Sequence, residues 1–201
     1  VPEGKRALGG IGCHYMAVDS IESTEFFTQM GGEGTPWIGI APFSHEKHVF
    51  AHLGDGTYKH SGILAIRASL DANVNITYKI LYNDAVAMTG GQEIGSNWDV
   101  EGIVKQVLAE GVKKVSILSE DPKRYNQLVN NEVKSLHRDS IITEQEELSQ
   151  YEGVSVLIFD QTCAAEKRRR RKRGLMEDPK KRVVINKDVC EGCGDCSVQS
   201  N

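Results

Sequence analysis

The 201-residue sequence contains no apolar run long enough to span a lipid bilayer. Its amino terminus, Val1 to Arg6, has neither an initiator methionine nor the hydrophobic region of a signal peptide, so we expect a piece of a longer protein. Proline is not in excess, low-complexity sequence is lacking, and the formal net charge is −4, which gives no bulk basic surface. These absences exclude a collagen-like or disordered chain, and we expect no membrane and no nucleic-acid partner.

The five cysteines are unevenly distributed. Cys13 and Cys163 are isolated, whereas Cys190, Cys193 and Cys196 have CxxCxxC spacing. An odd number in tight spacing favours metal or cluster binding in a reducing cytosol over disulfides, so we expect a cytoplasmic protein. Three thiolates on one glycine-containing loop suit a [4Fe–4S] cluster, whereas zinc usually needs a distant second pair. No fourth cysteine follows in this sequence, so the ligand set in the chain is expected to be incomplete.

Strand-like and helix-like segments alternate through the middle of the chain. Strands are predicted at His48–Gly54, Val74–Leu81, Val112–Leu118, Val133–His137 and Val154–Phe159. Helices are predicted at Ser61–Leu70, between the cap Asp99 and the stop signal Gly111, at 122–130 and at Ser140–Gln150. In the first of them, Ile63, Leu64, Ile66 and Leu70 are predicted to face the core. The segment Val133–His137 could instead finish the preceding helix, but Asn130-Asn131 is a stop signal. The alternation predicts an α/β fold, a doubly wound, mostly parallel sheet. The first forty-odd residues are glycine-rich and poorly periodic, and Gly9–His14 and Met30–Gly34 within them are predicted to be loops.

The end of the chain has a different composition. Lys167 to Arg173 is an unbroken basic run, typical either of a solvated linker or of a nucleic-acid or nuclear-import patch; we favour the linker. Arg182 to Val189 is predicted as a short strand that leads into the cysteines. We therefore expect a cofactor-binding domain at 1–162, a basic linker at 163–181, and the start of a ferredoxin-like 4Fe-4S segment at 182–201.

Two short motifs carry the chemistry, and each follows a predicted strand. Leu53-Gly54-Asp55-Gly56 ends one strand, and Asn83 follows the next, with residues 57–82 between them. Glycines let backbone approach a diphosphate closely, while carboxylate and amide oxygens are the ligands that Mg²⁺ prefers. Because ligands bind beyond the carboxyl ends of strands in such sheets, these motifs predict a metal–diphosphate site. Ordinary loop acids and amides are the plainer alternative.

This pattern resembles the diphosphate motif of thiamine-diphosphate enzymes. The resemblance implies that the side chains of Asp55 and Asn83 and the backbone carbonyl of Ala85 hold Mg²⁺. Tyr82 departs from the family, in which Asn or Asp often precedes the metal-binding Asn, but that position is not a ligand in the family pattern. Tyr82 therefore does not contradict the predicted Mg²⁺ site.

Further strings resemble the 2-oxoacid:ferredoxin oxidoreductases, in particular the large indolepyruvate:ferredoxin oxidoreductase type. These strings are 12–16 (GCHYM), 28–34 (TQMGGEG), 87–92 (AMTGGQ) and 160–166 (DQTCAAE), and the likeness covers nearly the whole chain. By that resemblance, Gly12 and Cys13 lie against the thiazolium or the substrate. Gly54 to Gly56 and Thr89-Gly90 wrap the diphosphate. Without this resemblance, a single cysteine such as Cys13 is more often a small buried residue than a functional one.

The resemblance also implies a reaction. It is the oxidative decarboxylation of a 2-oxoacid, here an aryl pyruvate such as indolepyruvate, to acyl-CoA, CO₂ and reduced ferredoxin. Coenzyme A and ferredoxin are then the partners, and the cofactors are thiamine diphosphate, Mg²⁺ and a [4Fe–4S] cluster. The pyrimidine-binding and gamma-type domains of such an enzyme are missing from this chain, and a homo-oligomer is expected.

The acid–base groups are less defined by the sequence. His14, His45, His48, His52 and His60 cluster near the motifs, and His60 is the best-placed candidate for a catalytic role. Thiamine enzymes activate the aminopyrimidine with a glutamate from a separate domain. The glutamates near these loops, Glu33 and Glu46, have no context that assigns them that role. We therefore expect the chain alone to be inactive.

Three alternatives come from other classes. A non-oxidative thiamine-diphosphate decarboxylase or synthase would share the diphosphate motif but would need no CxxCxxC segment. A non-catalytic cofactor or electron-transfer module would keep the cysteines and tolerate loss of Asp55 or Asn83. A nucleotide-binding α/β protein is disfavoured because the sequence has neither a GxGxxG nor a Walker loop.

Overall fold

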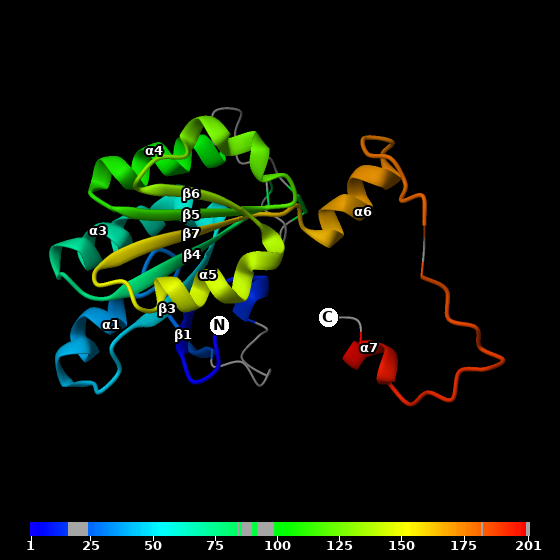
Figure 1. Ribbon diagram of the computed structural model, residues 1–201, viewed down its shortest axis with the longest axis horizontal. Helices are drawn as coiled ribbons and strands as arrows, with labels where there is room; N and C mark the ends of the chain where they lie inside the picture. The colour runs from blue at the N-terminus through cyan, green and yellow to red at the C-terminus, as the bar shows by residue number, and fades with distance from the viewer. Residues whose placement is uncertain (16–23, 84, 86–89, 92–98, 182, 200–201) are drawn as a thin grey trace. The chain divides into compact units, whose positions relative to one another are not determined.

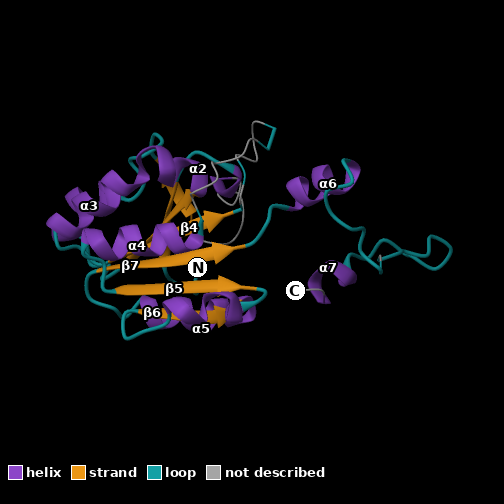
Figure 2. Ribbon diagram, turned by 90° about the horizontal axis from the view of Figure 1, so that it is seen from above, coloured by secondary structure: helices purple, strands orange, loops and turns teal. Residues whose placement is uncertain are grey.

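Seven parallel strands form one sheet in the computed structural model, which describes residues 1–15, 24–83, 85, 90–91, 99–181 and 183–199. The strands are β1 Arg6–Gly9, β2 Thr24–Phe27, β3 Val49–Gly54, β4 Ile76–Tyr82, β5 Lys114–Ser119, β6 Val133–His137 and β7 Val154–Asp160. Their spatial order is β2-β1-β3-β4-β7-β5-β6. Figure 2 shows β4, β7 and β5 pointing the same way.

Helices connect these strands. They are α1 Thr35–Ile40, α2 Asp55–Thr57, the π-helical turn η3 Tyr58–Gly62, α3 Ile63–Asp71, α4 Val100–Glu110, α5 Ile141–Leu148, α6 Ala164–Lys172 and α7 Asp195–Gln199, with 3-10 turns η2 Ala41–Phe43, η5 Pro122–Leu128 and η6 Arg138–Ser140. The α4 helix begins at Asp99, whose side chain accepts the Gly102 N–H, and ends at Gly111 with φ 109°. Within the described segments, no helix has the length and apolar character needed to cross a membrane.

The two faces of the sheet carry different cores. Alternate strand residues face opposite sides, so Val156 and Ile158 of β7 join the large core cluster, whereas Leu157 joins a smaller one. The large cluster is covered by α1, α3 and α4, and the smaller one by Leu148 of α5. Figure 1 shows α3 and α4 on one side of the sheet and α5 on the other. Helices on both faces of a parallel sheet confirm the doubly wound α/β prediction.

The middle of the chain follows the sequence prediction, whereas the first forty residues contain elements that the sequence did not indicate. All five predicted strands and the helices around α3, α4 and α5 form near the expected bounds. The predicted loops at 9–14 and Met30–Gly34 are confirmed, apart from Gly9, which ends β1, whereas β1, β2 and α1 were not predicted. These elements have only four to six residues each, too few to show a period.

Three smaller predictions were also wrong. Leu64, expected to face the core from α3, is 55% exposed. The segment predicted as a helix at 122–130 is instead the 3-10 turn η5, which begins at Pro122, ends at Leu128 and packs against β6. The described part of the predicted strand 182–189 forms no strand, and Val183 is 97% exposed. No neighbouring strand offers this segment hydrogen bonds among the described residues.

The chain separates into two compact units, Val1–Glu166 and Lys167–Asn201. The second unit contains most of α6, the whole of α7 and the extended segment between them. The predicted boundary between the cofactor domain and the basic linker, at 162, falls shortly before this division and inside the turn that precedes α6. The ferredoxin-like character of residues 182–201 stays a prediction.

Candidate functional site

The side chain of Asp55 joins the ends of two adjacent strands. It is the first residue after β3 and is 2% exposed. Its Oδ1 accepts the N–H of Gly56 at 2.8 Å, and its Oδ2 accepts the N–H of Asn83 at 2.8 Å. β3 and β4 are hydrogen-bonded in parallel, so the residues that follow them meet at one edge of the sheet. The structure thus brings together the two residues that the sequence singled out.

Asn83 supplies an oxygen that no described residue of the protein uses. Its backbone N–H donates to Asp55, while its Oδ1 is buried and has no hydrogen-bond partner in the described part of the chain. Ala85, two residues on, is 2% exposed. A buried amide oxygen without a partner is costly unless a ligand completes it. A carboxylate, an amide oxygen and a loop carbonyl are hard oxygen donors, so these residues fit Mg²⁺.

Gly54, the first glycine of the first motif, leaves room beside these oxygens. A Cβ added at Gly54 would meet nothing within 4 Å among the described residues. No protein neighbour therefore requires glycine there, whereas a diphosphate close to the backbone would. Gly90 has φ 121°, a conformation that favours glycine. Thr89, the other residue predicted to wrap the diphosphate, lies outside the described residues.

The loop after β1 lies next to this edge, because β1 pairs with β3. Gly12 and Cys13 belong to this loop, and Cys13 is exposed. A Cβ at Gly12 would lie 2.6 Å from Cε1 of His14, so the His14 ring packs directly on the Gly12 backbone. The placement leaves Cys13 accessible to a ligand, and its contact with the thiazolium or substrate stays a prediction.

The five histidines of the cluster occupy different environments. His60 is exposed on η3, one turn after Asp55, and its Nδ1 lies 3.0 Å from Ser61 Oγ. His48 is 2% exposed and its Nε2 lies 2.8 Å from Thr77 Oγ1. Burial, with a smaller contribution from Lys5, lowers the pKa of His48 to about 4. His48 is therefore a neutral, buried residue with a structural partner.

The rings of His14 and His52 stack on each other, a pairing that the sequence did not indicate. Their rings stack with centroids 6.3 Å apart, and the Nε2 atom of each is buried without a partner. Burial lowers the pKa of His14, which also donates a hydrogen bond to the Gly10 carbonyl. Burial, and then the charge of Lys79, lowers the pKa of His52 well below its usual value. Both rings are therefore neutral near pH 7.

Glu33 is wholly buried, which its sequence context did not reveal. Its exposed fraction is 0%. It lies between Gly32 and Gly34, and the φ angle of Gly34 is 82°. Its Oε2 accepts the Gly31 N–H at 2.8 Å, while Oε1 has no partner. The signal that could have found it is a glutamate enclosed by glycines in the short loop between β2 and α1.

A second acidic anchor lies at the end of β7. Asp160 Oδ2 accepts hydrogen bonds from Tyr125 Oη at 2.7 Å, from Ser119 Oγ at 3.0 Å and from Arg124 Nη1 at 3.3 Å. Burial, then this hydrogen bond, raises the pKa of Tyr125. A nearby cavity of about 180 Å³ is lined by Tyr82, Asp99, Val100, Glu101, Arg124, Tyr125 and Gln127. Asp160 thus holds η5 against the carboxyl ends of the strands, beside Tyr82.

The three clustered cysteines do not converge. Cys190, Cys193 and Cys196 are all exposed free thiols, the last of them in α7. Among the described residues, no three His, Cys, Asp or Glu side chains gather closely enough to hold a metal ion. The predicted magnesium ligands are of a different kind, because besides Asp55 they are an amide oxygen and a backbone carbonyl. Cluster binding by the cysteines stays a prediction.

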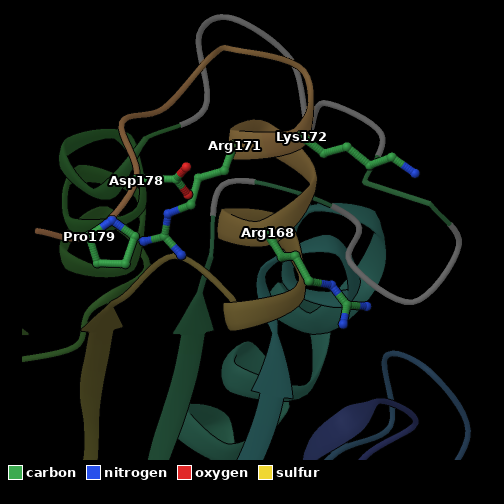
Figure 3. A pocket seen from close by; sticks show the side chains of 5 residues that line it. All are labelled: Arg168, Arg171, Lys172, Asp178 and Pro179. Carbon is green, nitrogen blue, oxygen red and sulfur yellow. The ribbon is translucent and has the colours of Figure 1, made fainter. Parts of the chain in front are cut away.

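The basic run lies on α6. A cavity of about 450 Å³ in the second unit is lined by Arg168, Arg171, Lys172, Asp178 and Pro179. Figure 3 shows Arg171 directed toward Asp178 and Pro179, whereas Lys172 extends away from them. Arg171 Nε also donates to the Glu177 carbonyl at 3.2 Å. The cationic groups diverge, so they do not concentrate positive charge on one point of this cavity.

A parallel α/β sheet with a carboxylate, a buried amide oxygen and an open glycine at the carboxyl ends of its strands is the arrangement expected of a diphosphate-binding domain. Residues 10–130 match the family described as "Thiamine pyrophosphate enzyme, C-terminal TPP binding domain". That family model covers more than half of the chain, so the chain belongs to the thiamine pyrophosphate enzymes (thiamine pyrophosphate is thiamine diphosphate). The diphosphate half of the predicted resemblance is thereby confirmed.

Individual proteins with lower similarity to the chain include two curated relatives and two solved structures. The chain is 26% identical to an indolepyruvate oxidoreductase subunit IorA of Thermococcus kodakarensis over 92% of its own length, and 28% identical to that of Pyrococcus abyssi over 75%. It spans only 29% and 22% of the length of these relatives. The fold resembles that of a 2-oxoglutarate:ferredoxin oxidoreductase from Magnetococcus marinus, with TM-score 0.59 and 20% identity, over 90% of this chain and 63% of the other. It also resembles a benzoylformate decarboxylase from Polynucleobacter necessarius, with TM-score 0.55 and 16% identity, over 81% of this chain and 31% of the other.

Proposed function

We propose that the chain is the diphosphate-binding part of a 2-oxoacid:ferredoxin oxidoreductase that oxidatively decarboxylates an aryl pyruvate. The observation that carries the cofactor assignment is the pair of Asp55 and Asn83. The carboxylate ties the two strand ends together, and the amide oxygen beside it is buried without a partner. Mg²⁺ bound by Asp55, Asn83 and the Ala85 carbonyl would satisfy that oxygen and hold the diphosphate.

Thiamine diphosphate supplies a nucleophilic carbon and an electron sink when bound, which is chemistry that side chains lack. The chain supplies the rest. Gly54 leaves space for the diphosphate at the carboxyl ends of the strands, and Asp55 holds the Asn83 backbone in place for the metal. Gly12 and exposed Cys13 border the position where a substrate would react. Cys190, Cys193 and Cys196 would supply part of an iron–sulfur path for single electrons to ferredoxin.

The choice of an aryl pyruvate rests on the likeness to two archaeal indolepyruvate oxidoreductase subunits. Oxidative rather than non-oxidative chemistry is favoured by the CxxCxxC segment, which a simple decarboxylase does not need. A turnover assay in the holoenzyme separates the two reactions. Reduction of ferredoxin with formation of acyl-CoA from indolepyruvate is expected, whereas release of an aldehyde without electron transfer would favour the decarboxylase.

The decisive test of the cofactor site is calorimetric titration of thiamine diphosphate into this chain with and without Mg²⁺. We expect Mg²⁺-dependent binding that Asp55→Ala and Asn83→Ala abolish. Asp71→Ala, an exposed aspartate at the end of α3, is the matched control and should bind normally. If the protein binds only when joined to a pyrimidine-binding domain, the site is shared between domains. If the variants bind as well as the wild type, the proposed site is wrong.

A further inference from the structure

Glu33 combines three properties that a purely structural glutamate rarely has together. Its side chain is 0% exposed, its Oε1 has no hydrogen-bond partner, and no cation is paired with it among the residues that the structure describes. Ionised carboxylates are buried only when paired or hydrogen-bonded, since desolvation disfavours the charge. Burial raises the pKa of Glu33, and hydrogen bonds from the N–H groups of Glu33 and Gly31 oppose this in part.

The position of this carboxyl connects it to the cofactor site. A Cβ at Gly10 would lie 2.5 Å from Glu33 Cγ and 2.7 Å from Oε1, so the unpartnered oxygen lies against the Gly10 backbone. Gly10 opens the loop that contains Gly12 and Cys13. On the other side, Gly31 packs so closely on Ser61 that a side chain at Gly31 would collide with it.

Ser61 belongs to the helical run that begins at Asp55. The segment Gly31–Glu33 therefore lies between the loop after β1, which Glu33 contacts, and the helical run after Asp55, which Gly31 contacts. The carboxyl ends of β1 and β3 are adjacent in the sheet, which places these segments at one edge. A substrate that binds against the Gly12–Cys13 loop would lie close to the one oxygen of Glu33 that no protein group uses.

We propose that Glu33 is a catalytic acid, whose Oε1 hydroxyl donates a proton to the carbonyl oxygen of the bound 2-oxoacid. The proposal rests on the proposed function. As the carbonyl carbon gains a bond to its nucleophile, the electron pair of the C=O π bond moves to oxygen. That oxygen takes the proton of Glu33, the Oε1–H bond breaks, and Glu33 becomes a carboxylate. It takes a proton back, through the substrate or water, before the next turnover.

The surroundings of Glu33 suit this proton exchange. The protonated form is favoured before reaction by burial, and the carboxylate formed accepts the Gly31 and Glu33 N–H groups. The other titratable groups nearby are Tyr78 of β4, whose hydroxyl donates to the Ala65 carbonyl, and His14, which donates to the Gly10 carbonyl. Burial raises the pKa of Tyr78 and lowers that of His14, so both stay neutral and leave the charge change to Glu33.

The test uses Glu33→Gln, which keeps the size and the acceptor for Gly31 but has no proton to donate. Binding of thiamine diphosphate with Mg²⁺ is measured first, followed by kcat of the holoenzyme with indolepyruvate across pH. We expect affinity within about threefold of wild type and a kcat lowered by about 10²-fold or more. The alkaline decline of wild-type activity, caused by ionisation of Glu33, should disappear from the variant, and Glu33→Asp should restore part of kcat.

Glu46→Gln is the matched control, since Glu46 is a partly exposed glutamate paired with Arg6, and its kcat should equal that of wild type. Unchanged kcat and pH profile in Glu33→Gln would overturn the proposal while leaving the cofactor assignment intact. A fall in cofactor affinity and melting temperature that accounts for the lost activity would show a structural role instead and would also overturn it. Failure of the wild type to bind the cofactor would overturn the proposed function, and this proposal with it.

Discussion

Asp55 and Asn83 share one site, yet their substitution should affect stability in opposite directions. Asp55 accepts two backbone N–H groups, from Gly56 and Asn83, each at 2.8 Å in a buried position. In Asp55→Asn one of these acceptors becomes an NH₂ group that faces an N–H donor. The variant loses one charge-assisted bond and leaves a buried donor unpaired, which costs about 2–4 kcal/mol.

Asn83→Ala keeps the backbone N–H that bonds to Asp55 and removes only an amide whose Oδ1 has no partner. Removing a buried oxygen without a partner is neutral or stabilises the protein by about 1 kcal/mol. Both variants nevertheless remove a predicted metal ligand. Mg²⁺-dependent binding of thiamine diphosphate should therefore fall at least about 100-fold in each, which corresponds to roughly 2.7 kcal/mol.

Urea unfolding followed by circular dichroism measures the first effect, and calorimetry with Mg²⁺ measures the second. The informative result is the contrast, an unstable Asp55→Asn beside a stable Asn83→Ala, with cofactor binding lost in both. Asp71→Asn, on the exposed end of α3, controls for the change of charge. Equal destabilisation by the two substitutions, or retained Mg²⁺-dependent binding in Asn83→Ala, would refute the reasoning.

Three further predictions follow from the same geometry. His48, with a pKa of about 4 in the fold against 6.5 for an ordinary histidine, binds fewer protons folded than unfolded. Stability should therefore rise with pH across that window, by roughly 3 kcal/mol, and the rise should be absent from urea unfolding of His48→Gln. Gly10→Ala should lower the free energy of unfolding by about 1–3 kcal/mol, because its Cβ would collide with Glu33. Gly39→Ala is the control and should not lower it, because a Cβ there meets nothing within 4 Å. Equal effects of the two substitutions would contradict the close packing of Gly10 on Glu33. Anaerobic reconstitution with iron and sulfide should load the holoenzyme with a cluster, and Cys193→Ser should reduce the iron bound; an unchanged iron content would remove the cysteines from the electron path.

The sequence by itself determined the α/β class, the strand–helix alternation from β3 to β7, and the positions of Asp55 and Asn83 after two strands. These features are local, because buried parallel strands are short apolar runs and helices show a 3.6-residue period. Their location at one edge then follows from the parallel arrangement alone.

Only the tertiary structure decided the strand order and the elements of the first forty residues. β1 and β2 have four residues each, and their pairing with β3 is a long-range contact that no local pattern records. The insertion of β7 between β4 and β5 is likewise a matter of packing between distant segments.

The sequence also did not indicate which titratable side chains are buried, because burial depends on the packing of distant segments. His60, the candidate chosen from its position after the diphosphate motif, lies exposed, whereas Glu33 in the loop before α1 is enclosed completely. The difference arises because Gly10 and Gly34 carry no side chains and let the β1 and β4 segments close around Glu33. Residue type set which groups could exchange a proton, and the packing of distant backbone set which one is shielded from water.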